Sequence, residues 1–255
     1  MVLNNMKNKK NKTKNKKSKI GILGYGEVGE AVAKFYKKPR IKDLNKDDDL
    51  KGIEILNVCI PWSNNFVKVV KREIKTINPK LTIIHSTVAP GTTKKLGKMV
   101  VCSPIRGIHP HLFKGIKTFV KYIGADNKKA GKLAESHFKK LGIKTKVFMP
   151  SITVEIGKLL DTTYYGLCIA FHGEMKKICD KTGIDFEKAI TDFNKTYNEG
   201  YKKLGIPNVI RPVLYPPKDG IGGHCIIPNI EIIKEYFNSP IFDFILKYKA
   251  KNKKI

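Results

Sequence analysis

The chain of 255 residues is 41% hydrophobic and 28% charged, as expected of one large folded domain or two small ones. Its 12 Phe and 10 Tyr supply a sizeable core and exclude disorder throughout. No apolar run approaches the roughly 20 residues of a membrane-spanning helix, and the first residues lack the apolar segment of a secretory signal. Five scattered cysteines give neither a disulfide framework nor a CxxC pair. We therefore expect a cytoplasmic protein without membrane insertion and without a metal site.

The net charge of +28 is large enough to suggest nucleic acid or an acidic membrane as a partner. Thirteen of these charges, however, are lysines near the two ends, in residues 7–19 and 247–254. The others are mostly lysines spread over predicted helix faces, without the interleaved arginines and aromatic residues of an RNA-binding patch. We expect weak, salt-sensitive adhesion to nucleic acid but no specific nucleic-acid partner.

Residues 1–18 are predicted to form a disordered basic tail, because they are rich in Lys and Asn and contain no acid. From residue 19 to residue 150, short apolar runs typical of strands alternate with lysine-rich helical stretches. This alternation predicts an α/β domain with a mostly parallel, Rossmann-like sheet and helices on both faces. Strands are expected at 20–25, 54–60, 81–86, 99–103, 119–125 and 145–148, and helices at 27–37, 64–77 and 128–141.

The pattern changes at residue 151, where apolar residues begin to recur at three- and four-residue steps. This spacing predicts one long amphipathic helix over about 152–182. Its apolar stripe is the expected seam of a homodimer, or alternatively packs on the sheet within one chain. A second helix near 185–198, a Pro- and Gly-rich loop at 206–223 and a short helix at 229–237 follow. We expect a helical substrate and dimerisation domain over 151–240 and a basic C-terminal tail at 241–255.

A GxGxxG pattern is formed by Gly24, Tyr25, Gly26, Glu27, Val28 and Gly29. The pattern alone is weak, but here it follows an apolar strand and opens a helical stretch, as dinucleotide binding requires. The first glycine would make the tight turn, the second would let a pyrophosphate approach the backbone, and the third would let helix and strand pack closely. The segment is therefore predicted to bind NAD; the alternative is a glycine-rich turn without a ligand.

An acidic residue at the end of the second strand would hold the ribose hydroxyls of the cofactor. Asp43 is the best candidate, although residues 47–49 are also aspartates, and Lys42 beside it leaves NADP open. Ligands lie at the carboxyl ends of the strands in such sheets. Further cofactor contacts are therefore expected from Pro61, Ser86 and Thr87.

Three more motifs follow in order: STVAPGTT at 86–93, EIGKL at 155–159 and GGHC at 222–225. Together with the glycine-rich turn they resemble the UDP-glucose/GDP-mannose dehydrogenase family over most of residues 19–229. The resemblance implies NAD-dependent oxidation of a sugar or nucleotide-sugar alcohol to a carboxylate. It also implies two hydride transfers that pass through a cysteine-bound thiohemiacetal and thioester.

Cys225 is the expected nucleophile, because the two preceding glycines leave its sulfur open to close approach and a thiolate attacks an aldehyde well. The alternative is a small buried cysteine. Lys158 is expected to stabilise an oxyanion; outside the family motif it would be interpreted as a solvated lysine. Thr162 and Asn229, each four residues further on, complete the expected catalytic group. Substrate contacts are expected from Arg106, His109, Arg211, Gly222, Gly223 and His224.

The sequence departs from the family where Ile105 replaces a Glu, Thr162 an Asn, and Asn229 an Asp. Asn cannot deprotonate water, so thioester hydrolysis lacks its usual carboxylate, and His109 or His111 is a candidate replacement. The family also carries a second Rossmann-like domain after the long helix, whereas this sequence ends about thirty residues past Cys225. We expect a short form whose substrate is smaller or whose missing contacts come from another subunit.

Two other functions fit the same residues. One is a two-electron, hydroxyacid-type dehydrogenase that uses Lys158 without a covalent intermediate. The other is a non-catalytic dinucleotide-binding module, favoured by Ile105 and Asn229 in place of carboxylates.

Overall fold

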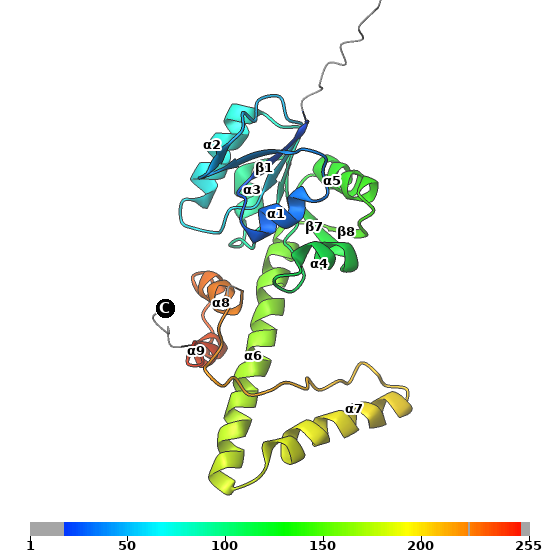
Figure 1. Cartoon of the computed structure of the whole chain (residues 1–255), viewed down its shortest axis with the longest axis vertical. Helices are drawn as coiled ribbons and strands as arrows, with labels where there is room; N and C mark the ends of the chain where they lie inside the picture. Colours follow the sequence, from blue (N-terminus) through cyan, green and yellow to red (C-terminus); the bar gives the residue numbers. More distant parts are fainter. Residues whose placement is uncertain (1–17, 224, 251–255) are drawn as a thin grey trace, which may run out of the picture.

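A computed structural model describes residues 18–223 and 225–250. The tail predicted at residues 1–18 lies outside the described residues except for Ser18, and so do His224 and residues 251–255. An α/β layer forms the first part of the molecule, and one long helix runs from it to a projecting arm (Figure 1).

Eight strands form one sheet in the order β3-β2-β1-β4-β5-β6-β7-β8. Neighbouring strands run parallel, except that β2 with β3 and β6 with β7 are antiparallel. The predicted mostly parallel, Rossmann-like sheet is thereby confirmed. The strands are β1 (Ile20–Leu23), β2 (Arg40–Asp43), β3 (Lys46–Asp47), β4 (Ile55–Val58), β5 (Leu81–Ile84), β6 (Val100–Cys102), β7 (Lys121–Ala125) and β8 (Thr145–Phe148).

Helices cover both faces of the sheet, and each face has its own apolar core. One core packs α1, α4 and α5 against the sheet around Ile22, Ile83 and Ile123, and the other packs α2 and α3 around Leu56 and Ile84. The helix predicted at 27–37 ends at Ala33, and Lys38, which precedes a proline, has φ of 52°. These helices are α1 (Glu27–Ala33), α2 (Phe66–Ile77), α3 (Thr92–Leu96), α4 (Leu112–Thr118) and α5 (Lys128–Lys140).

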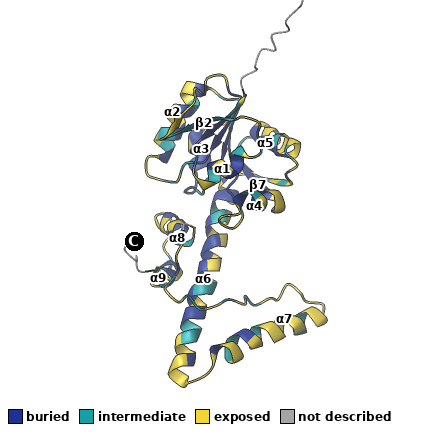
Figure 2. Ribbon diagram, viewed as in Figure 1, coloured by how far each residue is buried: buried dark blue, intermediate teal, exposed yellow. Residues whose placement is uncertain are grey.

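The long helix α6 spans Ile152–Thr182, as the apolar spacing predicts. A π-helical segment (Glu187–Asp192) and α7 (Phe193–Lys203) follow it and form the projecting arm (Figure 1). Figure 2 shows that α7 is largely exposed and that α8 (Ile226–Lys234) packs close to α6. A third apolar core joins α6 and α8 to α9 (Pro240–Leu246).

The helix α9 lies inside the stretch predicted as a basic tail, so that prediction does not hold for residues 241–246. Two signals for a helix are present there. The side chain of Ser239 caps the helix by accepting a hydrogen bond from the backbone N–H of Ile241, and Pro240 occupies its first turn. Phe242 and Ile245 then bury their side chains against α6 and α8. Because several lysines follow this short apolar helix, residues 241–255 as a whole have a basic composition.

Candidate active site

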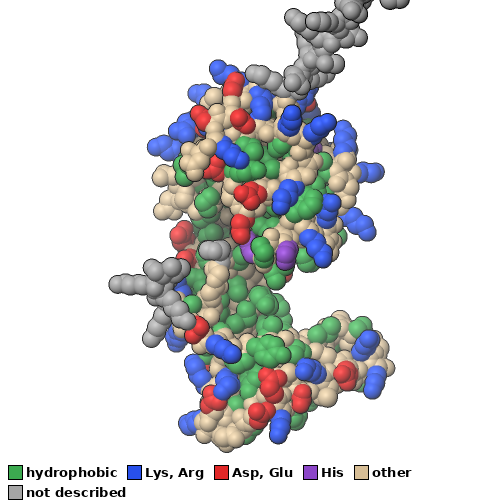
Figure 3. All heavy atoms as spheres, in the orientation of Figure 1, with side chains coloured by type: hydrophobic (Ala, Val, Ile, Leu, Met, Phe, Trp, Pro, Cys, Tyr) green, Lys and Arg blue, Asp and Glu red, His purple; other side chains and the backbone are tan. Residues whose placement is uncertain are grey.

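A crevice of about 620 Å³ opens at the carboxyl ends of β1, β4 and β5, between the sheet, α6 and α8. This is the edge at which parallel sheets bind ligands. Figure 3 shows the molecular surface, with histidine side chains near the junction of the sheet with the helical part. The predicted site residues that line the crevice are Gly26, Glu27, Val28, Pro61, Ser86, Thr87, His109, Lys158, Gly223, Cys225 and Asn229.

The glycine-rich turn has the shape that a dinucleotide needs. Gly24 has φ of +94°, and a Cβ there would lie 2.7 Å from the backbone nitrogen of Ile60. A Cβ on Gly29 would lie 2.1 Å from the carbonyl oxygen of Gly24, so this glycine lets α1 pack on β1. A Cβ on Gly26 would meet no atom within 4 Å, and Gly26 faces the crevice. The residues present therefore fit a bound dinucleotide.

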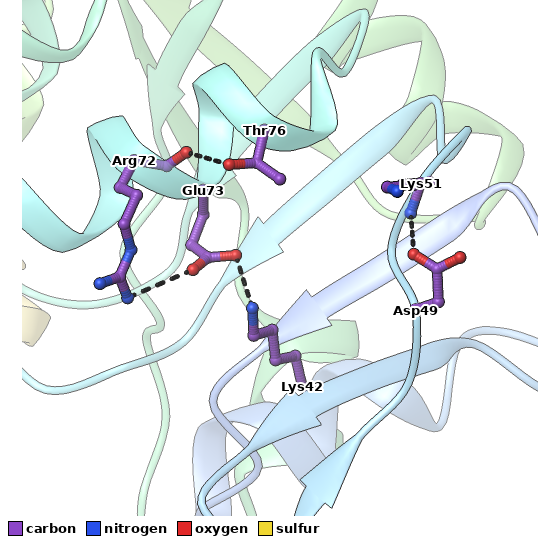
Figure 4. A network of polar contacts seen from close by, with 6 residues as sticks. All are labelled: Lys42, Asp49, Lys51, Arg72, Glu73 and Thr76. Carbon is purple, nitrogen blue, oxygen red and sulfur yellow. Dashed lines mark hydrogen bonds and ion pairs between the residues drawn. The ribbon is translucent and has the colours of Figure 1, made fainter.

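The acidic residue expected near the ribose is Asp43, which is the last residue of β2. Its carboxylate accepts a hydrogen bond from the backbone N–H of Tyr25, inside the glycine-rich turn. Lys42, on which the NADP alternative depends, points instead toward α2 (Figure 4), where its Nζ lies 3.0 Å from Oε2 of the buried Glu73. Lys42 is therefore paired with Glu73 and does not face the glycine-rich turn.

Lys158 and Cys225 flank the same crevice from different helices. Lys158 lies in the second turn of α6, and burial lowers its pKa, while the nearby Cys225 and Asp161 act in the opposite direction. Cys225 is exposed and is the N-cap residue of α8. Lys158 also lines a neighbouring cavity of about 310 Å³ together with Arg106 and Asp161. An amine and a thiol therefore border the space in which a substrate would meet the cofactor.

Cys225 has a histidine neighbour from the sheet side of the crevice. Its Sγ lies 3.6 Å from Nε2 of His109, and Nδ1 of His109 lies 2.5 Å from Oε2 of Glu27. Asn229, four residues after Cys225, is 5% exposed at the wall of the crevice. Sequence spacing gives no sign of the contact between His109 and Cys225, because the two residues are 116 positions apart.

Several predicted residues do not reach the crevice. The Thr162 hydroxyl donates a hydrogen bond to the Lys158 carbonyl at 3.0 Å, along its own helix. Arg106 lines the neighbouring cavity instead. Arg211 packs its guanidinium 4.1 Å from the ring centre of Tyr197, on the arm. Gly222 is not among the lining residues that the structure describes, and His224 lies outside the described residues.

His85 is a crevice residue that the sequence prediction missed. It directly follows β5 and is 2% exposed, and its Nε2 lies 2.9 Å from Oδ1 of Asn57. Its Nδ1 is buried without a hydrogen-bond partner among the described residues. Burial lowers the pKa of His85, which keeps the ring neutral. Its position at a strand end, next to Ser86 and Thr87, is the signal that could have identified it.

Residues 152–246 match the family described as "UDP-glucose/GDP-mannose dehydrogenase family, central domain". The UDP-N-acetyl-D-mannosamine dehydrogenase of Methanococcus maripaludis is 31% identical over 222 residues, which cover 79% of this chain and 49% of that protein. The enzyme of the same name from Pyrococcus horikoshii is 25% identical over 224 residues, which cover 78% and 50%. The chain thus spans about half the length of the curated relatives it matches.

Solved structures share the fold. UDP-D-ManNAc dehydrogenase from Pyrococcus horikoshii has a TM-score of 0.72 at 19% identity, over 90% of this chain and 67% of that one. A 3-hydroxyisobutyrate dehydrogenase from Mycobacterium tuberculosis has a TM-score of 0.65 at 12% identity, over 90% and 91% of the two chains. Among the residues that the structure describes, no helix is both long and apolar enough to cross a membrane.

Proposed function

Because this chain belongs to the UDP-glucose/GDP-mannose dehydrogenase family, we propose that it oxidises the primary alcohol of a sugar or nucleotide sugar with NAD. The observation that carries the proposal is the meeting of three features at one crevice: the glycine-rich turn, Lys158 and Cys225. Each comes from a different part of the chain, and each supplies a separate requirement of the reaction.

NAD, held by residues 24–29 and Asp43, would supply the hydride acceptor. Lys158 is placed to receive the alcohol proton or to stabilise a developing oxyanion, because burial lowers its pKa and brings the amine closer to exchanging a proton at neutral pH. Cys225, exposed at the crevice, is placed to attack an aldehyde carbon through its sulfur. Asn229 contributes a buried amide beside it, not a carboxylate.

The test is cofactor reduction by the purified protein with NAD or NADP. The substrates offered are UDP-N-acetyl-D-mannosamine, UDP-glucose and the free sugars. We expect NAD reduction with two NADH per sugar consumed, and loss of about two orders of magnitude or more in turnover for Cys225→Ser. Cys168→Ser is the matched control, because Cys168 lies on α6 away from the crevice. Turnover of Cys225→Ser at the wild-type rate would overturn the covalent step.

One NADH per substrate, with Cys225→Ser active and Lys158→Met inactive, would identify a two-electron dehydrogenase instead. The fold shared over nearly the full length of a 3-hydroxyisobutyrate dehydrogenase supports this second candidate. Calorimetric binding of NAD without turnover of any alcohol would indicate a non-catalytic dinucleotide-binding module. The number of NADH formed per substrate distinguishes the two enzymes, and NAD binding without any turnover identifies the non-catalytic module.

A further inference from the structure

Three side chains from separate segments form one row across the crevice. Glu27 begins α1, His109 lies in the loop before α4, and Cys225 is the N-cap residue of α8. The row is continuous: the carboxylate of Glu27 contacts one ring nitrogen of His109 at 2.5 Å, and the other ring nitrogen lies 3.6 Å from the sulfur. All three residues line the crevice.

We propose that His109 is the base that removes the proton of Cys225, and that Glu27 is a positioning residue for His109. The inference rests on the proposed function, in which Cys225 is the nucleophile. In the starting state, Nδ1–H of a neutral His109 donates to Glu27, which leaves the lone pair of Nε2 facing the sulfur. The S–H bond breaks, its electron pair stays on sulfur, and the proton moves to Nε2. A thiolate and an imidazolium result, with no change in net charge.

The surroundings favour this charge-separated pair. The imidazolium would lie between the thiolate and the carboxylate of Glu27. The sulfur would face the amino end of α8, whose first turn contains no acidic residue. The side chains of His109 and Glu27 are 36% and 57% exposed, so neither charge needs to be buried.

The position of Glu27 is a second, independent reason. It lies in the turn whose backbone N–H groups are expected to face the cofactor phosphates, where a negative side chain opposes an anionic ligand. Its pairing with His109 turns the carboxylate toward the histidine and sets a cation beside it once His109 is protonated. The pairing with His109 therefore explains why a carboxylate lies in this turn.

Other candidate bases are less well placed. His111 is the N-cap residue of α4 and is not among the described lining residues of the crevice. His85 is 2% exposed and is bonded to Asn57. Lys158 shares the crevice, but no hydrogen bond joins it to the sulfur among the contacts of the described residues. Of the titratable groups that line the crevice, including Glu231 and Glu235, His109 is the one whose hydrogen bond to the Cys225 sulfur is found among the described residues.

The test measures the reactivity of Cys225 directly, without cofactor or sugar. The full-length protein is alkylated with iodoacetamide at neutral pH, peptide mapping follows the label on Cys225, and ultraviolet absorbance reports the thiolate. We expect His109→Gln to slow labelling by about tenfold and to remove the thiolate absorbance. Glu27→Gln should have a smaller effect in the same direction, and Glu27→Asp, which keeps the carboxylate, should recover part of the rate.

The matched controls are His111→Gln for the histidine and Glu30→Gln, on the exposed side of the same helix, for the glutamate. Both should label Cys225 at the wild-type rate, and far-UV circular dichroism checks that each variant folds. Labelling of His109→Gln at the wild-type rate, or equal slowing by His111→Gln, overturns the role of His109. That result together with normal sugar oxidation would leave the dehydrogenase proposal intact, so the two failures can be told apart.

Discussion

Lys121 places an amine in the core of the sheet, where it is only 4% exposed. Its Nζ donates to the carbonyl oxygen of Ser103 at 2.7 Å. Burial lowers the pKa of Lys121 from 10.5 to about 7. Between these two pH values the unfolded chain keeps the proton that the folded chain has released. Folding stability therefore rises with pH through this window, by roughly 1.4 kcal/mol per pH unit from this one group.

We therefore predict that Lys121→Met removes this pH dependence and makes the protein more stable at pH 7 and below, by several kcal/mol as an order of magnitude. Urea unfolding at pH 6, 7, 8 and 9 measures the effect as the difference between variant and wild type, which cancels other titrating groups. Lys117→Met, on the surface of α4, is the control. A wild-type slope in the variant would contradict the interpretation.

Among individual residues, the sequence predicts the glycine-rich turn, Lys158 and Cys225, because each belongs to a motif with its own local chemistry. The contacts of His109 with Glu27 and Cys225 could not be predicted, since they depend on how three distant segments close around one crevice. Arg211 is a case of the opposite kind. An arginine suits an anionic substrate, yet within this chain its side chain packs on Tyr197 and Tyr201.

The elements α6 and α3 are joined by Glu155, which connects two of the motifs in the sequence. Glu155 is 2% exposed, and its carboxylate accepts hydrogen bonds from the backbone N–H groups of Gly91 at 2.6 Å and Thr93 at 2.8 Å. The Thr93 hydroxyl donates a third bond at 2.6 Å. Burial raises the pKa of this carboxyl. The contact fixes the start of α6, and with it Lys158, against the sheet.

We predict that Glu155→Gln destabilises the protein by about 1–3 kcal/mol, because an amide cannot accept from all three donors. The measurement is urea unfolding at pH 7, with the exposed Glu187→Gln as control. Unchanged stability would show that the three bonds are replaced by water at little cost.

Helices are predicted well where apolar residues recur over many turns, as in α6, whose bounds agree with those expected from the sequence. Prediction fails for α3, α4 and the two-residue β3, because elements of two to seven residues carry too little periodicity to be distinguished from loops. The helix predicted at 229–237 begins three residues earlier, at Ile226, and Pro228 lies in its first turn, where proline is tolerated.

The molecule as a whole leaves an apolar surface open where α6 meets the arm. Hydrophobic side chains gather in this hollow in Figure 3. Phe171, Ile178 and Phe193 are 55%, 62% and 61% exposed. Exposed apolar surface of this kind marks protein contacts. It agrees with the homodimer expected from the stripe on α6, which stays a prediction.

We predict a dimer in solution that Ile178→Lys converts to a monomer, because a charge would be buried in the seam. Analytical ultracentrifugation across a range of protein concentrations measures the change. Leu44→Lys, at a side chain 99% exposed beside β2, is the control and should leave the mass unchanged. A wild type that sediments as a monomer at every concentration would contradict the prediction.

The row from Glu27 to Cys225 also has a consequence for biosynthesis. The glycine-rich turn and His109 leave the ribosome early, whereas Cys225 is synthesised only after α6 and the arm. Nascent chains whose synthesis has not yet extended to α8 contain the glycine-rich turn but lack the thiol of Cys225. Only alkylation of position 225 at a rate above that of His109→Gln would therefore report that both halves of the polypeptide had come together.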